Sequence, residues 1–149
     1  MNHFANVIFS LLIFAAGSNA FATAISPGNI LGRYDVNASA FFKKVRIDFK
    51  VINEKEFEIF QYDRDGKPEE TCNGTYNIVQ NKSLRMGVAT ITTVLKGIFN
   101  CPSNRTKMID FDLDFQNKSV EDIVTGTTVI ITTSMAPMKI KANVKKIGN

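Results

Sequence analysis

The stretch DFDLDFQNKSVE, residues 110–121, decides between two folds. Its carboxylates fall at positions 1, 3, 5 and 12, where an EF-hand loop between two helices places its calcium ligands. Such a loop needs glycine at position 6, where the backbone turns with a positive φ, and this sequence has Phe115 there. In residues 107–115, KMIDFDLDF, apolar and polar residues strictly alternate from Ile109 on. The stretch therefore predicts a half-buried strand and not a calcium loop.

The aspartates of this strand, Asp110, Asp112 and Asp114, make its polar face. We expect them to lie opposite basic residues of a neighbouring strand, because opposite charges stabilise cross-strand pairs. Two sets of residues could supply the cations, namely Lys44, Arg46 and Lys50 or Lys139, Lys141 and Lys145. A weak surface calcium site is the alternative, and titration calorimetry that gave no heat with calcium would exclude it.

The same alternation recurs along the chain after residue 22. In KKVRIDFKVI, residues 43–52, every second residue from Val45 to Val51 is apolar and the residues between them are charged. GNILGRYDV, residues 28–36, reads as the first strand. Turn-forming residues separate the later runs, at NEKE, DRDGKPEE, NKS, PSN and MAP. We count about eight or nine short strands, which predicts an all-β fold, a single antiparallel barrel or sandwich.

Two segments could form a helix instead. In SVEDIV, residues 119–124, Ser119 can cap a single turn with Asp122 three residues on. NASAFFKK, residues 37–44, is either a loop or a short turn of helix. Neither changes the predicted fold class.

The amino-terminal segment predicts export. Residues 1–22 contain no Lys, Arg, Asp or Glu. VIFSLLIFAA, residues 7–16, is shorter than the roughly 20 apolar residues of a spanning helix, but it matches the apolar region of a signal peptide. Ala20 and Ala22 offer a cleavage site before Thr23, with cleavage before Phe21 as the alternative. We expect a signal peptide in residues 1–22 and a secreted or periplasmic single domain in residues 23–149.

The chain has two cysteines, Cys72 and Cys101. An exported protein with this minimal even number favours one disulfide. Each cysteine falls on the apolar face of its run, so a core-facing bridge between two strands fits the pattern. Closing a loop of this length stabilises the fold by roughly 3.5 kcal/mol in the chain-entropy model. A reactive thiol or a metal pair is the alternative, but the sequence lacks the CxxC spacing typical of either.

Several chemistries are disfavoured by missing residues. The single histidine, His3, lies in the predicted signal peptide, so the exported domain has no imidazole for a nucleophile system or a His-bearing zinc site. No glycine-rich phosphate loop is present. Glu69 and Glu70 could in principle act on glycosides, but adjacent acids in a turn are far more often solvated. We therefore expect a non-enzymatic protein without a cofactor or metal.

The carboxyl-terminal segment KIKANVKK, residues 139–146, is basic. Its cations are Lys139, Lys141, Lys145 and Lys146. We interpret them as a solvated strand face, with contact to an anionic membrane surface as the alternative. No aromatic residue lies among them to stack on bases, so we expect no nucleic-acid partner.

The segment ILGRYDV near the start of the exported domain, followed by antiparallel strands and a mid-chain cysteine pair, resembles the small lipocalin-like (calycin-type) barrels. Gly32-Arg33-Tyr34 is similar to the Gly-x-Trp of the first lipocalin strand, with Tyr replacing Trp. The resemblance implies an apolar ligand held inside a barrel.

Aromatic residues on inward faces are the candidate ligand contacts. These are Tyr34, Phe49, Phe57, Tyr76, Phe99 and Phe111. The alternative is that they fill a dry core without a cavity, since periodicity reports only which face is buried. A rival function is a protein-interaction module, such as an inhibitor or surface-associated adaptor of an exported protein. It would use the loops in residues 63–74 and 101–107, which the predicted disulfide would stiffen.

Overall fold

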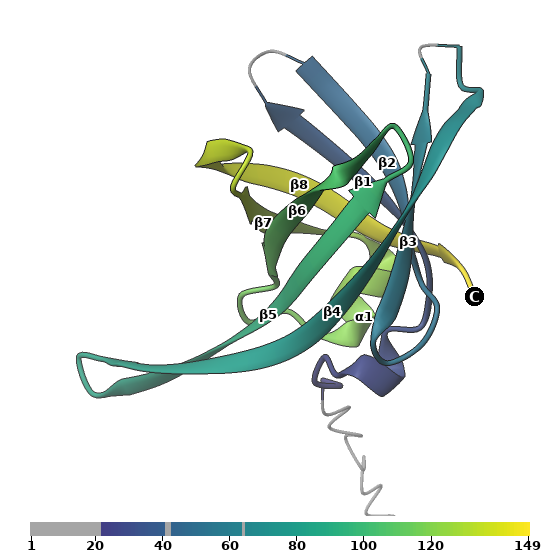
Figure 1. The fold of residues 1–149 in the computed structure, drawn as a ribbon. Helices are drawn as coiled ribbons and strands as arrows, with labels where there is room; N and C mark the ends of the chain where they lie inside the picture. Colours follow the sequence, from purple (N-terminus) through teal and green to yellow (C-terminus); the bar gives the residue numbers. More distant parts are fainter. Residues whose placement is uncertain (1–21, 41–42, 64) are drawn as a thin grey trace, which may run out of the picture.

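The computed structural model describes residues 22–40, 43–63 and 65–149, and it shows a closed barrel of eight strands (Figure 1). Each strand pairs antiparallel with the next, and β8 closes the barrel against β1. The strands are β1 (Gly32–Ala40), β2 (Lys43–Val51), β3 (Glu56–Tyr62), β4 (Pro68–Arg85), β5 (Val88–Cys101), β6 (Asn104–Asp114), β7 (Thr127–Thr133) and β8 (Ala136–Gly148). The predicted all-β antiparallel fold is confirmed, and of its two forms the barrel is the observed one.

Residues 1–21 of the predicted signal peptide lie outside the described residues. In the described part of the chain, no helix has the length and apolar character needed to cross a membrane.

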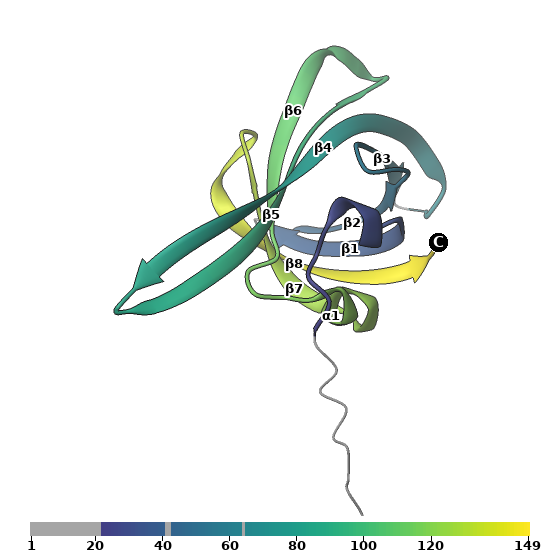
Figure 2. The ribbon, with the colours of Figure 1, turned by 90° about the horizontal axis from the view of Figure 1, so that it is seen from below.

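One end of the barrel is covered, and we call it the closed end. A 3-10 turn, η1 (Pro27–Asn29), and a helix, α1 (Val120–Thr125), lie across it (Figure 2). Ile123 of α1 and the nearby Ile25 and Ile30 join the core, each with 3% or less of its surface exposed. Strands β1, β3, β5 and β7 end at the opposite end of the barrel, which we call the open end.

The predicted cap of α1 is confirmed. The Asp122 backbone N–H donates to Ser119 Oγ at 3.3 Å, and the Ser119 backbone N–H donates to Asp122 Oδ2 at 2.8 Å. These reciprocal bonds satisfy backbone donors that a helix start leaves free. The helix ends at Gly126, whose φ of 108° favours glycine.

The predicted turn at NKS is wrong. Asn81, Lys82 and Ser83 lie inside β4 and pair with residues of β5. The chain reverses instead at Met86 and Gly87, with φ values of 51° and 78°. Positive φ at both central residues is the geometry of the two-residue turn that matches strand twist. One long hairpin of two strands therefore replaces three predicted shorter strands.

The predicted partners of the strand aspartates are also wrong. Strand β6 lies between β5 and β7, because the strand order follows the chain, whereas the expected cations lie on β2 and β8. Asp112 instead forms an ion pair with Lys96 of β5, with Nζ and Oδ2 2.6 Å apart. Asp110 accepts a hydrogen bond from the Ser134 hydroxyl, and Asp114 accepts one from the Gln116 backbone N–H at 2.7 Å.

Smaller boundaries shift as well. The first strand begins at Gly32 and not at residue 28, because the chain first makes the turn η1. Residues 37–40 belong to β1 and residues 43–44 to β2, so the helical alternative for residues 37–44 is wrong for these, while residues 41–42 lie outside the described residues. The last turn falls at Ser134 and Met135, one residue earlier than predicted, and β8 begins at Ala136.

The predicted disulfide joins Cys72 of β4 to Cys101 of β5, with the two Cα atoms 4.3 Å apart. Asn73 lies opposite Asn100 in the β4–β5 ladder, and the two cysteines are the next residues along it. The bridge therefore links opposite residues of neighbouring strands. Both cysteines are buried, and Gln61 Nε2 lies 3.4 Å from Cys72 Sγ. The bridge thus joins β4 to β5 at the open end of the barrel.

Two glycines allow aromatic rings to approach the barrel wall. The Phe57 ring lies against Gly74 and the Phe111 ring against Gly97, and an added Cβ at either glycine would overlap the ring. Phe57 stacks on Phe49 with ring centroids 4.7 Å apart, and Phe111 meets Phe57 edge-on at 5.6 Å. Together with Phe99, these rings form what we call the aromatic layer: Phe49, Phe57, Phe99 and Phe111.

We predict that Gly74→Ala destabilises the fold by about 1–3 kcal/mol, the usual cost of overpacking a core. Its Cβ would meet the Phe57 ring and would lie 2.6 Å from the Ile98 backbone oxygen. Denaturant unfolding measures the difference. Gly148→Ala is the matched control, because nothing lies within 4 Å of its added Cβ. Equal stability of the two variants would contradict the packing.

Acid should remove a contribution made by Glu121. Its carboxylate accepts hydrogen bonds from the Thr23 hydroxyl and from the Thr23 backbone N–H, at 2.5 and 3.0 Å. These bonds lower the pKa of Glu121 from 4.5 to about 2. A carboxyl group with a lowered folded-state pKa stabilises the fold above pH 4.5 and loses that contribution as the pH falls toward about 2.

Glu121→Gln should therefore flatten the dependence of unfolding free energy on pH between about 2 and 4.5. Denaturant unfolding at a series of pH values checks this. The same substitution at Glu69, an exposed residue near the open end, serves as the control. An unchanged slope in the Glu121 variant would show that the Thr23 contact does not hold in solution.

Candidate functional site

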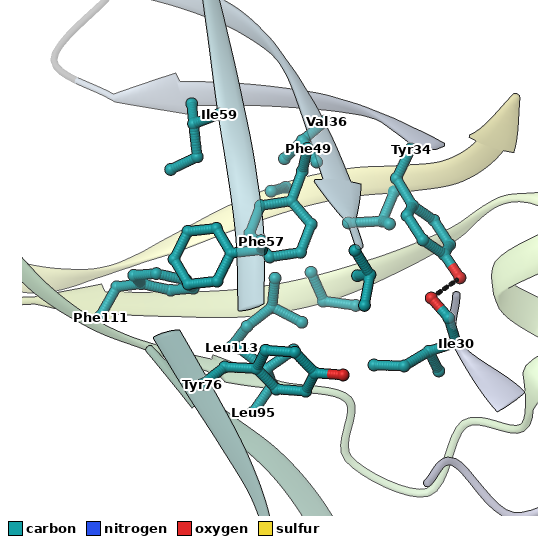
Figure 3. Packing of buried hydrophobic residues seen from close by; sticks show 14 of the residues in the cluster. Ile30, Tyr34, Val36, Phe49, Phe57, Ile59, Tyr76, Leu95, Phe111 and Leu113 are labelled. Carbon is teal, nitrogen blue, oxygen red and sulfur yellow. Dashed lines mark hydrogen bonds between the residues drawn. The ribbon is translucent and has the colours of Figure 1, made fainter. Parts of the chain in front are cut away.

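An apolar cavity of about 210 Å³ lies inside the barrel toward the open end. Its wall is formed by inward-facing residues of six strands and of the β7–β8 turn. These are Val36, Ile47, Phe49, Ile59, Phe99, Ile109, Phe111, Leu113, Ile131, Thr133 and Met135. Figure 3 shows several of these side chains converging on the barrel interior. The cavity is the described interior space best suited to hold a small molecule.

The wall offers no free polar anchor. Its single hydroxyl belongs to Thr133, whose Oγ1 donates to the Asp110 carbonyl at 2.8 Å and accepts from the Met135 backbone N–H at 3.3 Å. None of the lining residues carries a charge. An occupant would be held by burial of apolar surface and by shape, at about 25 cal/mol per Å² removed from water.

Three rings of the aromatic layer, those of Phe49, Phe99 and Phe111, form the inner boundary of the cavity. Phe99 meets Phe111 at a centroid distance of 5.9 Å and Phe57 at 6.4 Å, both edge-on. Beyond the layer, toward the closed end, only about 20 Å³ of space remains among residues such as Tyr34, Leu95 and Ile123. That space holds one water molecule at most. The barrel is thus packed in its closed half and hollow in its open half.

The six predicted ligand contacts separate into two groups. Phe49, Phe99 and Phe111 line the cavity. Tyr34, Phe57 and Tyr76 do not belong to its wall, so the structure does not bring all six together.

The two tyrosines serve the closed end. The Tyr34 hydroxyl donates to the Ile30 carbonyl at 2.7 Å (Figure 3), and burial raises the pKa of Tyr34 to about 12. The Tyr76 hydroxyl donates to the Asn53 carbonyl at 2.9 Å. Each ring therefore fastens a connecting segment over the barrel.

Most of the aliphatic wall was absent from the predicted contacts. Five aliphatic residues of the wall lie on inward faces that period-two alternation predicts, namely Val36, Ile47, Ile59, Ile109 and Leu113. Position along the strand decides which inward residues meet the cavity, and position depends on where the closed end and the aromatic layer lie. Met135 lies in a predicted turn, and alternation does not predict which way the side chain of a turn residue faces.

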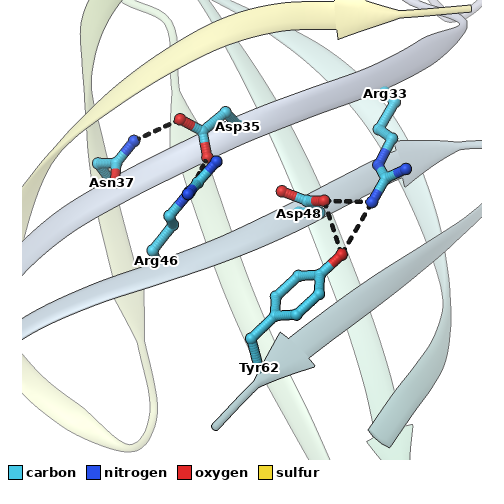
Figure 4. A network of polar contacts seen from close by, with 6 residues as sticks. All are labelled: Arg33, Asp35, Asn37, Arg46, Asp48 and Tyr62. Atoms are coloured by element: carbon cyan, nitrogen blue, oxygen red, sulfur yellow. Dashed lines mark hydrogen bonds and ion pairs between the residues drawn. The ribbon is translucent and has the colours of Figure 1, made fainter. Parts of the chain in front are cut away.

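A polar network lies on the outside of the barrel, over β1, β2 and β3 (Figure 4). Arg33 donates to Asp48 and to the Tyr62 hydroxyl, and Tyr62 also donates to Asp48 at 3.0 Å. Asp48 is 5% exposed although it faces outward, because these side chains cover it. A groove of about 590 Å³ borders the network. Because Asp48 is already paired, we interpret the network as a structural clasp across the three strands.

One group among the described residues has metal-like spacing, formed by Glu70, Cys72 and Cys101. Its sulfur atoms are joined in the disulfide and are therefore not thiolate ligands. The Glu70 carboxylate accepts hydrogen bonds from the Ser103 backbone N–H and hydroxyl, at 3.1 and 2.9 Å. This contact ties together the two loops that the interaction-module hypothesis singled out.

The carboxyl-terminal lysines follow the predicted strand face. Lys139, Lys141 and Lys145 are exposed on β8, whereas Ala142 and Val144 between them are buried. Lys146 is half-buried, and its side chain passes close to Gly32. The lysines are spread along one strand of the barrel wall.

Comparison with models of known protein families found no matching family, and comparisons with curated proteins and with solved structures found no match. The chain is therefore described by its own fold, a closed barrel of eight antiparallel strands with one disulfide.

Proposed function

We propose that this protein is an exported, non-enzymatic barrel that binds a small apolar molecule, or the end of an apolar chain, through its open end. The observation that carries the proposal is the cavity of about 210 Å³, walled by apolar side chains. A well-packed protein core has few voids larger than a water molecule. An apolar space of this size that opens toward one end of a barrel favours a binding role over a purely structural one.

The size of the cavity sets the class of ligand. Its 210 Å³ lies below the roughly 300–1,000 Å³ of drug-sized sites. At about 30 Å³ per heavy atom, the liquid share of one water, it takes about seven heavy atoms. A ligand with a longer chain would leave its remaining length, and any polar head group, outside the open end.

The lipocalin-like resemblance supports the same role. Lipocalins are up-and-down barrels of about eight strands that hold a ligand inside, and the strand order here is of that kind. Gly32-Arg33-Tyr34, the motif that carries the resemblance, begins β1 next to the closed end. We propose the lipocalin-like relationship at the level of architecture and ligand class.

Export is part of the proposal. A formed disulfide fits an oxidising compartment. If cleavage falls before Thr23, the new amino group would replace the Thr23 backbone N–H that lies 3.0 Å from Glu121 Oε2. The ammonium group of the exported chain would then form an ion pair with that carboxylate, which supports this cleavage site over the one before Phe21.

The interaction-module role is the second candidate. The contact between Glu70 and Ser103, next to the disulfide, holds the start of β4 and the β5–β6 connection together at the open end. Loops held in one arrangement lose less entropy on binding. A protein partner would then dock over the open end and not inside the cavity.

A series of straight-chain alcohols tests the ligand proposal. We expect affinity to rise about fourfold for each added CH₂ group, the equivalent of about 0.8 kcal/mol. The rise should flatten beyond about seven carbons, when the cavity is full. Titration calorimetry measures each affinity. Affinity that does not depend on chain length would contradict an apolar interior site.

A cavity-filling variant separates interior from surface binding. Ile131→Phe adds volume at the cavity wall and should weaken binding of the longer alcohols by at least about tenfold, because the added ring takes up space. Ile98→Phe makes the same change at an exposed residue of β5 and should leave binding unchanged. Equal loss in both variants would move the site out of the cavity.

A further inference from the structure

The β4–β5 hairpin projects to the side of the barrel near the closed end, and we call residues 77–92 the arm (Figures 1 and 2). Strand β3 pairs with β4 only as far as Thr75, and β6 pairs with β5 only from Val94 on. Within the described residues, the arm is therefore a two-stranded ribbon with both edges unpaired. Isolated ribbons of this kind are only marginally stable in water.

The arm exposes apolar side chains around its turn. Leu84 is 77% exposed, Met86 99%, Val88 66% and Ile91 47%. These residues flank or form the turn at Met86 and Gly87. A ribbon that is surrounded by solvent and has no partner is expected to carry polar residues at such positions. The exposed apolar residues of the arm are instead typical of a contact surface.

The hydrogen bonds at Thr93 show which way the β5 edge faces. The Thr93 backbone N–H donates to the Gln116 carbonyl at 3.1 Å, and its carbonyl accepts from the Phe115 backbone N–H at 2.9 Å. Both groups therefore point away from β4. Backbone direction alternates along a strand, so those of Ala89 and Ile91 point the same way, where no described strand pairs with them.

The two edges of the arm differ in their protection. Natural sheets blunt exposed edges with charged residues, lysine above all, and with proline. Strand β4 carries Lys82 and Arg85 in its last four residues. Residues 88–94 of β5, VATITTV, contain no charge, no proline and no glycine, and all but Ala89 are β-branched. The β5 edge thus has the composition that favours pairing with another strand.

We propose that the β5 edge of the arm pairs with the same edge of a second copy of this chain. The strands would run antiparallel about a two-fold axis at Thr90, with Ala89 opposite Ile91 of the partner subunit. About four backbone hydrogen bonds would join the copies, two for each such pair. The ladder would end at Thr93, whose edge groups are already bonded.

Side chains and charges fit this arrangement. Leu84 faces Ala89 across the hairpin, and Lys82 faces Ile91, so Leu84, Ala89 and Ile91 share one face of the arm. In the dimer, Ala89 would lie opposite Ile91 of the partner subunit, and Leu84 would continue the same apolar row one strand farther, so exposed apolar surface is covered. The cationic β4 strands would lie outermost. The contact is self-complementary, so it closes on two copies and does not propagate.

A second copy fits the edge better than a lipid surface. A membrane would bury the apolar side chains of the turn but would leave the backbone donors and acceptors of Ala89 and Ile91 unpaired, at a cost for each. Pairing with an identical uncharged strand satisfies both. The shared surface is small, so we expect a weak and concentration-dependent dimer.

Amide hydrogen exchange tests the proposal at single residues. The amides of Ala89 and Ile91 should exchange fast in dilute protein and become protected as concentration rises. Those of Thr90 and Thr92 point toward β4 and should exchange more slowly than those of Ala89 and Ile91 in dilute protein. Sedimentation of the same samples should show a monomer passing to a dimer. Exchange of Ala89 and Ile91 that does not depend on concentration would overturn the proposal.

Matched variants locate the interface. Thr90→Lys sets two like charges opposite each other at the two-fold axis and should raise the dimer dissociation constant by up to about fivefold. Ser83→Lys adds the same charge directly across the hairpin from Thr90, one strand farther from the axis, and should leave most of the dimer intact. Equal effects of the two variants would place the contact elsewhere.

Ala89→Pro removes one edge donor without breaking a bond to β4, because proline is tolerated where the N–H faces out of an edge strand. It should weaken the dimer while the thermal stability of the barrel stays close to that of the unaltered protein. Protein that stays monomeric at all concentrations but sediments with anionic vesicles would overturn the proposal and assign the arm to lipid.

Discussion

The structure depends on the contact between large aromatic rings and the two glycines that admit them. Phe57 and Phe111 could not lie so close to the wall of β4 and β5 if Gly74 and Gly97 carried side chains. Drawn against the wall, the rings meet Phe49 and close the barrel interior across its middle. The half of the barrel toward the closed end is packed, and the half toward the open end is hollow. A purely aliphatic interior of the same strands would have no such boundary.

The same hairpin that supplies the glycines also links the two ends of the molecule. Its disulfide lies at the open end, the aromatic layer rests on its middle, and the arm projects to the side near the closed end. The ligand proposal and the pairing proposal therefore concern opposite ends of β4 and β5. The two proposals depend on different residues. The ligand proposal depends on the glycines and cysteines within the barrel, and the pairing proposal depends on the uncharged edge of the arm.

Local patterns predicted the parts of the fold that depend on local physics. Alternation gave the strands and their inward faces, Ser119 and Asp122 gave the cap of α1, and the cysteine count gave the bridge. The hairpin turn was misplaced because Asn81 and Ser83 are good turn formers, yet they lie inside β4, whereas Met86 adopts a positive φ that few non-glycine residues favour. The wall of the cavity was only partly predicted, since depth inside a closed barrel depends on register between strands and not on any one of them.

The most direct test of the account is a crystal structure of the protein under xenon pressure, since dry apolar cavities take up xenon. We predict xenon density between Phe99, Phe111 and Ile131, on the open side of the aromatic layer, and none between Tyr34 and Ile123. Ordered water in place of xenon at the first position, or rings that fill it, would contradict a barrel that is hollow in its open half.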